Sequence, residues 1–170
     1  IVTKSFMNML SQDPKDVRIG MVLPAQYDKD LQEEYGDAKI FINKFPADKD
    51  DVGEMRLNNL PLLRLSEVYL VRAEAYYWLN DDENSQKDLS SVMRKRISGF
   101  GSLGVSGDDL LKEIKNERAR ELYLEGFRLS DLKRWHDPIK RQKQLYSLQG
   151  PYNNEMEVKY TDAKYRFTTW

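Results

Sequence analysis

Apolar residues follow two different spacings along the chain, which divide it into three regions. In residues 1–61, two segments, 17–24 and 39–46, alternate apolar and polar residues and each ends in proline. This alternation is typical of β-strands, so we predict a small β-hairpin with an acidic loop between its strands. Residues 136–170 are interrupted by Pro138 and end in a strand-like segment rich in aromatic residues. We predict an irregular tail there.

Residues 62–135 have the spacing of amphipathic helices. The first predicted helix, 62–79, carries apolar residues on two faces, so we expect it to be covered on two sides. The same spacing favours a place in the core, and not a sugar-binding surface, for Tyr69 and Trp78. Asn80 follows where a left-handed turn is needed, a conformation that asparagine tolerates. A second helix is predicted over 83–97, which makes a helical hairpin.

A glycine- and serine-rich loop, residues 98–107, leads to a third predicted helix. Ser106 and Asp109 have the spacing of a helix-capping pair, and we expect Gly126 to end this helix. A short fourth helix is predicted over 127–135. The predicted fold class is therefore mainly α, with helical hairpins, a small β-hairpin and long irregular loops.

Residues 75–89 resemble the turn of a tetratricopeptide repeat. In that repeat, small and aromatic residues pack the first helix, and a second small residue lets the next helix approach. Ala75 and Ser85 supply the small residues, while Asn80 replaces the usual glycine. An ordinary helical hairpin would also explain this segment.

Acidic and basic residues alternate through residues 114–135, among apolar ones. Arg118 lies four residues after Ile114 and four before Leu122, so it interrupts the apolar stripe of the third helix. A charge in that position must be paired, because its desolvation costs several kcal/mol. We predict a structural ion-pair network formed by Glu117, Arg118, Glu121, Glu125, Arg128, Asp131 and Arg134.

The composition argues against several classes of function. The chain has no cysteine, and His136 is its single histidine, so neither a thiolate site nor a site with two histidines is available. Its 27 Lys and Arg balance 28 Asp and Glu, and the basic segments 93–96 and 133–144 are better explained as solvated helix ends than as a nucleic-acid surface. Carboxylates one helical turn apart, as at Glu121 and Glu125, do not flank a scissile bond. We predict no enzyme activity, no cofactor and no metal.

Two motifs stand out in the helical segments. An Ala-Glu-Ala segment at 73–75 follows Arg64, and the string from Glu117 to Trp135 has the pattern ERxxEL…EGxRxxDLxRW. With these motifs, the helical segments resemble the SusD/RagB family. The resemblance implies tetratricopeptide-like helical hairpins. It also implies a surface-exposed, lipid-anchored outer-membrane protein of Bacteroidetes that passes glycans or other nutrients to a SusC-like TonB-dependent transporter. Family members are longer, so we expect this chain to be their C-terminal part, cut at both ends and without the lipid-bearing residue.

No ligand residue carries over from the family's motif. Aromatic residues beyond the helices, Tyr152, Tyr165 and Trp170, are the candidates for stacking on sugar rings. An alternative interpretation is a tetratricopeptide-type protein-interaction module that binds no glycan.

Overall fold

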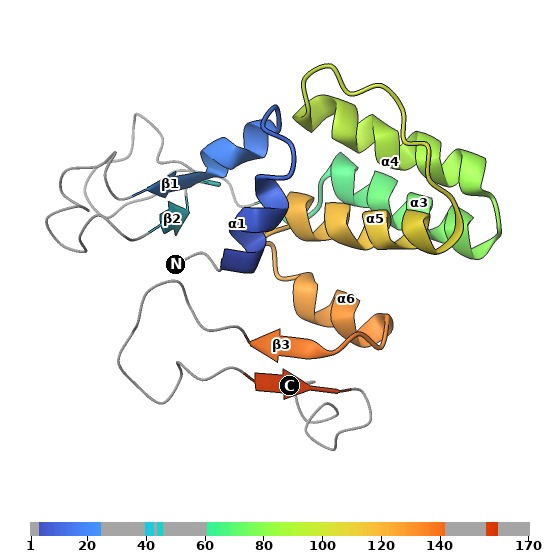
Figure 1. Cartoon of the computed structure of the whole chain (residues 1–170). Helices are drawn as coiled ribbons and strands as arrows, with labels where there is room; N and C mark the ends of the chain where they lie inside the picture. The colour runs from blue at the N-terminus through green and yellow to red at the C-terminus, as the bar shows by residue number, and fades with distance from the viewer. Residues whose placement is uncertain (1–3, 25–39, 43, 46–60, 142–155, 160–170) are drawn as a thin grey trace, which may run out of the picture.

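The computed structural model describes residues 4–24, 40–42, 44–45, 61–141 and 156–159. Helices α3 (Leu65–Trp78), α4 (Asp82–Arg96) and α5 (Gly107–Glu121) lie side by side, and the shorter α6 (Arg128–Arg134) follows α5 (Figure 1). The predicted mainly-α class is confirmed. No helix in the described ranges is long and apolar enough to cross a membrane.

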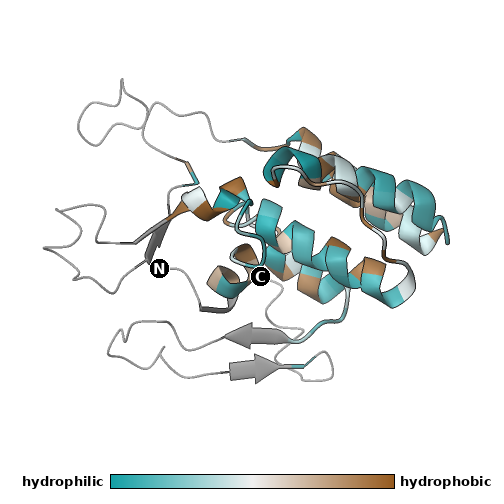
Figure 2. Cartoon of the chain, turned by 45° about the horizontal axis from the view of Figure 1, so that its top comes forward, coloured by the Kyte–Doolittle hydropathy of each residue, from teal (hydrophilic) through white to brown (hydrophobic). Residues whose placement is uncertain are grey.

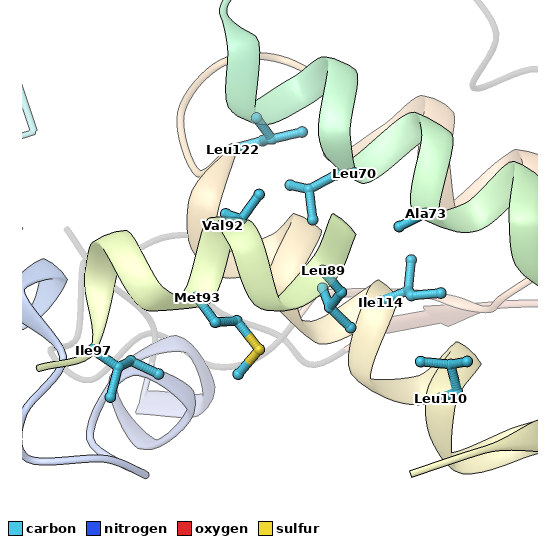
Figure 3. Close-up of a cluster of buried hydrophobic side chains, with 9 residues drawn as sticks. All are labelled: Leu70, Ala73, Leu89, Val92, Met93, Ile97, Leu110, Ile114 and Leu122. Atoms are coloured by element: carbon cyan, nitrogen blue, oxygen red, sulfur yellow. The ribbon is translucent and has the colours of Figure 1, made fainter. Parts of the chain in front are cut away.

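The three long helices enclose one hydrophobic core (Figure 3). Each large apolar side chain buried in it contributes about 1.5–3 kcal/mol. The core residues are Leu70, Ala73, Leu89, Val92, Met93, Ile97, Leu110, Ile114 and Leu122. The helices nevertheless carry more hydrophilic than hydrophobic positions (Figure 2), so each buries a narrow stripe only.

The α3–α4 hairpin has the tight turn that the sequence predicts. Asn80 adopts a left-handed conformation with φ of 59°. Beyond the turn, the Ser85 hydroxyl donates a 2.7 Å hydrogen bond to the carbonyl of Ala73, and both residues are fully buried. Only small side chains permit this approach of the two helices.

Contrary to the prediction from the sequence, helix α3 is not covered on two sides within the described part of the chain. Leu65, Val68, Val71 and Trp78 are all exposed, and Trp78 is 62% exposed. The prediction that Trp78 belongs to the core was therefore wrong, because helical spacing marks a face as apolar without showing that another element covers it. Tyr69 does pack against the core.

The ends of α5 differ from the prediction in two ways. Ser106 occupies the N-cap position but makes no capping hydrogen bond with its side chain. The carboxylate of Asp82 instead accepts the hydrogen bond from the backbone N–H of Gly107, at 3.0 Å. The helix also ends at Glu121, before Gly126, because the chain turns sharply at Leu124 and Gly126, which have φ of 66° and 84°.

The N-terminal region contains two elements that the sequence did not indicate. Helix α1 (Lys4–Leu10) packs near the end of α5, where Phe6 stacks on Tyr123 with ring centroids 3.6 Å apart. A 3₁₀ helix, η1 (Val17–Met21), replaces the first half of the predicted strand. It forms because the Asp16 carboxylate accepts a hydrogen bond from the backbone N–H of Arg18, at 2.9 Å.

Short antiparallel strand pairs complete the structure. Strand β1 (Val22–Pro24) pairs with β2 (Ile40–Ile42), with Val22 opposite Ile42, which confirms the predicted hairpin in a shorter form. Strand β3 (Ile139–Arg141) pairs with β4 (Met156–Val158), with Ile139 opposite Val158.

Candidate functional site

The carboxylate of Glu121 lies at the centre of the charged residues, where three arginines reach it. Arg64 Nη1 lies 2.5 Å and Arg96 Nη2 lies 2.6 Å from Oε1, while Arg18 Nη1 lies 3.1 Å from Oε2. These arginines come from η1, from the residue before α3 and from the last turn of α4. One buried carboxylate, 2% exposed, therefore connects four segments of the chain.

Both glutamates considered as a possible acid/base pair are held ionised. Burial alone would raise the pKa of Glu121, but the hydrogen bonds from Arg96 and Arg64 outweigh it and lower the pKa to about 2. The pKa of Glu125 is also lowered, since hydrogen bonds from Arg64 and Lys44 outweigh the effect of burial. A general acid must hold a proton near neutral pH, so neither carboxyl is suited to that task.

A second carboxylate on α5, Glu117, extends the network toward the N-terminal region. Arg18 Nη1 lies 2.6 Å from Glu117 Oε1, and the same guanidinium lies 2.7 Å from the carboxylate of Asp16. Arg120 Nε lies 2.9 Å from Glu117 Oε2 and also pairs with Glu113. Glu117 is fully buried, so its contacts with these partners replace the hydration that the carboxylate has lost.

A separate group of charges joins α5, α6 and α3. Arg118 on α5 lies 2.8 Å from the carboxylate of Asp131 on α6. Arg134 lies 3.0 Å from the same carboxylate and also pairs with Glu74 on α3. The indole N–H of Trp135 donates a 2.7 Å hydrogen bond to Glu74. Burial would raise the pKa of Glu74, but these hydrogen bonds from Arg134 and Trp135 lower it.

The structure brings together six of the seven residues expected in the ion-pair network, in two groups. Arg128 is the exception, since it is exposed and forms no ion pair in the part of the chain that the structure describes. The carboxylate of Asp131, its nearest expected partner in sequence, is already occupied by Arg118 and Arg134. The aromatic candidates Tyr152, Tyr165 and Trp170 lie outside the described residues.

The sequence analysis missed eight further members of these groups. Six come from segments distant in sequence, namely Asp16, Arg18, Lys44, Arg64, Glu74 and Arg96, and two lie on α5 itself, Glu113 and Arg120. One signal was available for Arg18, because a lone arginine in the apolar segment 17–24 needs a buried partner. No cluster of His, Asp and Glu able to hold a metal ion occurs among the described residues.

The sequence matches the profile of the SusD family over residues 12–169. The chain belongs to the SusD family. Its helical architecture is thus that of a known family fold, as the resemblance implied.

Named relatives of the SusD family agree with this assignment. The starch-binding protein SusD of Bacteroides thetaiotaomicron is 39% identical over 77 residues, which are 45% of this chain and 13% of that protein. A SusD superfamily protein of the same species superposes on 94% of this chain with a TM-score of 0.69 and 29% identity. A putative sugar binding protein of Bacteroides vulgatus covers 96%, with a TM-score of 0.70 and 29% identity. The chain spans 35% and 34% of these two solved chains.

Proposed function

We propose that this chain is the scaffold part of a cell-surface protein that binds glycans and delivers them to a SusC-like TonB-dependent transporter. Membership of the SusD family supports the proposal, as do relatives named as starch-binding and sugar binding proteins. By the same relationship, the whole protein would be lipid-anchored at the surface of the outer membrane. The chain spans about a third of its solved relatives, so these activities belong to the longer protein.

One observation supports the scaffold role: the carboxylates in the ion-pair network around Glu121 are already occupied by cations of the same chain. Glu117, Glu121 and Glu125 each already accept hydrogen bonds from arginine or lysine side chains of other segments. A carboxylate occupied in this way is not available to a substrate, so the network holds segments together and performs no chemistry. We therefore propose that the protein is not an enzyme.

Intrinsic tryptophan fluorescence tests the glycan-binding proposal. The full-length protein and this chain would be titrated in parallel with a panel of polysaccharides. A saturable change in the longer protein alone would place the sugar site outside this chain, while a change in both would make Tyr152, Tyr165 and Trp170 the residues to replace. No response of either protein to any glycan would contradict glycan binding.

A second candidate function, a protein-interaction module, is favoured by one observation. The outer face of α3 presents exposed Leu65, Val71 and Leu79 beside Trp78. Exposed apolar patches commonly mark protein-binding surfaces. This function would be favoured over the first if two results were found together. The protein would respond to no glycan, and Val71→Asp would abolish its binding to the transporter.

A further inference from the structure

A basic groove lies between the N-terminus of α3 and the C-terminus of α4. Its volume is about 920 Å³, large enough for sugar rings. Four cationic side chains line it, Arg64, Arg94, Lys95 and Arg96, and no carboxylate lines it within the described part of the chain. Three of these cations belong to the segment 93–96, which the sequence analysis treated as a solvated helix end.

Two of the four cations are neutralised by glutamates that do not line the groove. Arg64 is paired with Glu121 and Glu125, and Arg96 is paired with Glu121. In this cluster of the ion-pair network, the five bases Arg18, Lys44, Arg64, Arg96 and Arg120 meet the five acids Asp16, Glu113, Glu117, Glu121 and Glu125. The cluster therefore has no surplus carboxylate to offer to another cation.

Arg94 and Lys95 are the cations that this cluster leaves unneutralised. Both are exposed, and neither forms an ion pair with any residue that the structure describes. Arg94 Nε donates a 3.0 Å hydrogen bond to the carbonyl of Gly101, which orients the guanidinium and leaves its two terminal nitrogens for another acceptor. An oriented guanidinium and an exposed ammonium that line one groove suit a ligand that carries carboxylate or sulfate groups.

The uncharged lining of the groove suits a sugar. The half-buried ring of Tyr69 and the side chain of Leu65 supply apolar surface, and Ser66 supplies a hydroxyl. Sugar rings pack on apolar and aromatic surfaces while their hydroxyls form hydrogen bonds. We propose that this groove binds an acidic glycan, with the anionic group of a uronate or sulfated sugar placed between Arg94 and Lys95. The proposal rests on the glycan-binding function proposed above and specifies the class of sugar.

The test compares the binding of acidic and neutral oligosaccharides of equal length to the full-length protein. Oligogalacturonate, a sulfated oligosaccharide and maltooligosaccharide would be titrated by calorimetry at low and high salt. We expect the acidic ligands to bind and their affinity to fall with salt. Arg94→Gln/Lys95→Gln should weaken their binding about tenfold or more, since two charge-assisted contacts are lost. Comparing the carboxylated with the sulfated ligand identifies which anionic group the groove prefers.

The matched control removes the same charge elsewhere on the helices. Lys87 on α4 and Lys112 on α5 are exposed and do not line the groove, so Lys87→Gln/Lys112→Gln should leave binding of the acidic ligands within about twofold. Equal losses in the two double variants would overturn the proposal, because net charge alone would then explain binding. Far-ultraviolet circular dichroism of both variants verifies that they are folded.

Other outcomes separate this proposal from the glycan-binding function. Binding of neutral but not acidic oligosaccharides would overturn the groove proposal and leave the general function intact. If polyglutamate bound as tightly as oligogalacturonate and depended equally on Arg94 and Lys95, the groove would be a site for acidic peptides. That result would also overturn the groove proposal. Absence of binding to any sugar would contradict both proposals.

Discussion

The guanidinium of Arg118 holds the carboxylate of Asp131 through two parallel hydrogen bonds, from Nε at 2.9 Å and from Nη2 at 2.8 Å. Both residues are 4% exposed, so α5 and α6 are joined by a buried charge pair. The third nitrogen, Nη1, is buried without a hydrogen-bond partner in the described part of the chain. An unpaired donor of this kind costs about 1–3 kcal/mol, which offsets part of what the pair contributes.

Replacing Arg118 by alanine should destabilise the protein by about 3 kcal/mol, because Asp131 would lose its buried partner. We expect the lower end of the usual range, since Arg134 remains 3.0 Å from Asp131. Urea denaturation measures the change in the free energy of unfolding. Lys112→Ala, an exposed site on the same helix, is the control and should change it by less than about 0.5 kcal/mol. A loss below about 1 kcal/mol for Arg118→Ala would contradict the structural role of the pair.

The stability should depend on pH through Glu121. Its pKa is about 2 in the folded chain against a usual 4.5, so the stabilisation is complete above pH 4.5 and is lost as the pH falls toward 2. The difference corresponds to about 3 kcal/mol. The free energy of unfolding should fall between pH 5 and pH 2 in both proteins, but by about 3 kcal/mol less in Glu121→Gln than in the unsubstituted protein. Identical pH profiles of the two proteins, measured by urea denaturation at each pH, would contradict this role of Glu121.

The turn between α3 and α4 should respond to substitutions at Asn80 according to backbone conformation. The residue is exposed with φ of 59°, a conformation in which a Cβ atom is unfavourable and which asparagine tolerates better than alanine. Asn80→Ala should therefore cost about 0.5–1 kcal/mol, while Asn80→Gly should be neutral or slightly stabilising. Thermal unfolding of both variants measures this difference. Equal melting temperatures for alanine and glycine would argue against a left-handed residue at this position.

The two tryptophans that contact Glu74 should differ in their contribution to stability. Trp135 donates a 2.7 Å hydrogen bond to Glu74 and lies beneath the cations of Lys115 and Arg134. Trp78 is exposed and donates a longer one, at 3.4 Å. We expect Trp135→Ala to cost about 2 kcal/mol and Trp78→Ala less than about 1 kcal/mol.

The exposure of Trp78 can be tested separately by fluorescence. Trp78→Phe should reduce the quenching of tryptophan fluorescence by acrylamide, and an unchanged response would show that Trp78 is shielded.

The helices and most of their core could be predicted from sequence because they depend on local spacing. Leu89, Val92, Met93 and Ile97 lie on the inner stripe of α4 as their periodicity indicated, and Asn80 marks the turn. What lies opposite a given face depends on other segments, so the exposure of Trp78 did not follow from its spacing.

The charged residues show the same limit. The pair of Arg118 and Asp131 is close in sequence and could be predicted, because a charge on an apolar stripe needs a partner. The arginines around Glu121 come from three distant segments, and no local pattern pairs Arg18 with a residue on α5. The family resemblance identified the charged string without indicating these partners.

The contacts of Arg18 also bear on how the chain unfolds. Stacked helical hairpins contact only their neighbours, so they can open one unit at a time from an end. Arg18, however, binds Glu117 and Glu121, which follow it by 99 and 103 residues in the sequence. Opening the N-terminal segment would leave both glutamates short of a partner inside α5, so partial opening carries much of the cost of complete unfolding. We therefore expect amide protons of η1 and of the last turn of α5 to exchange with solvent together, in one cooperative transition.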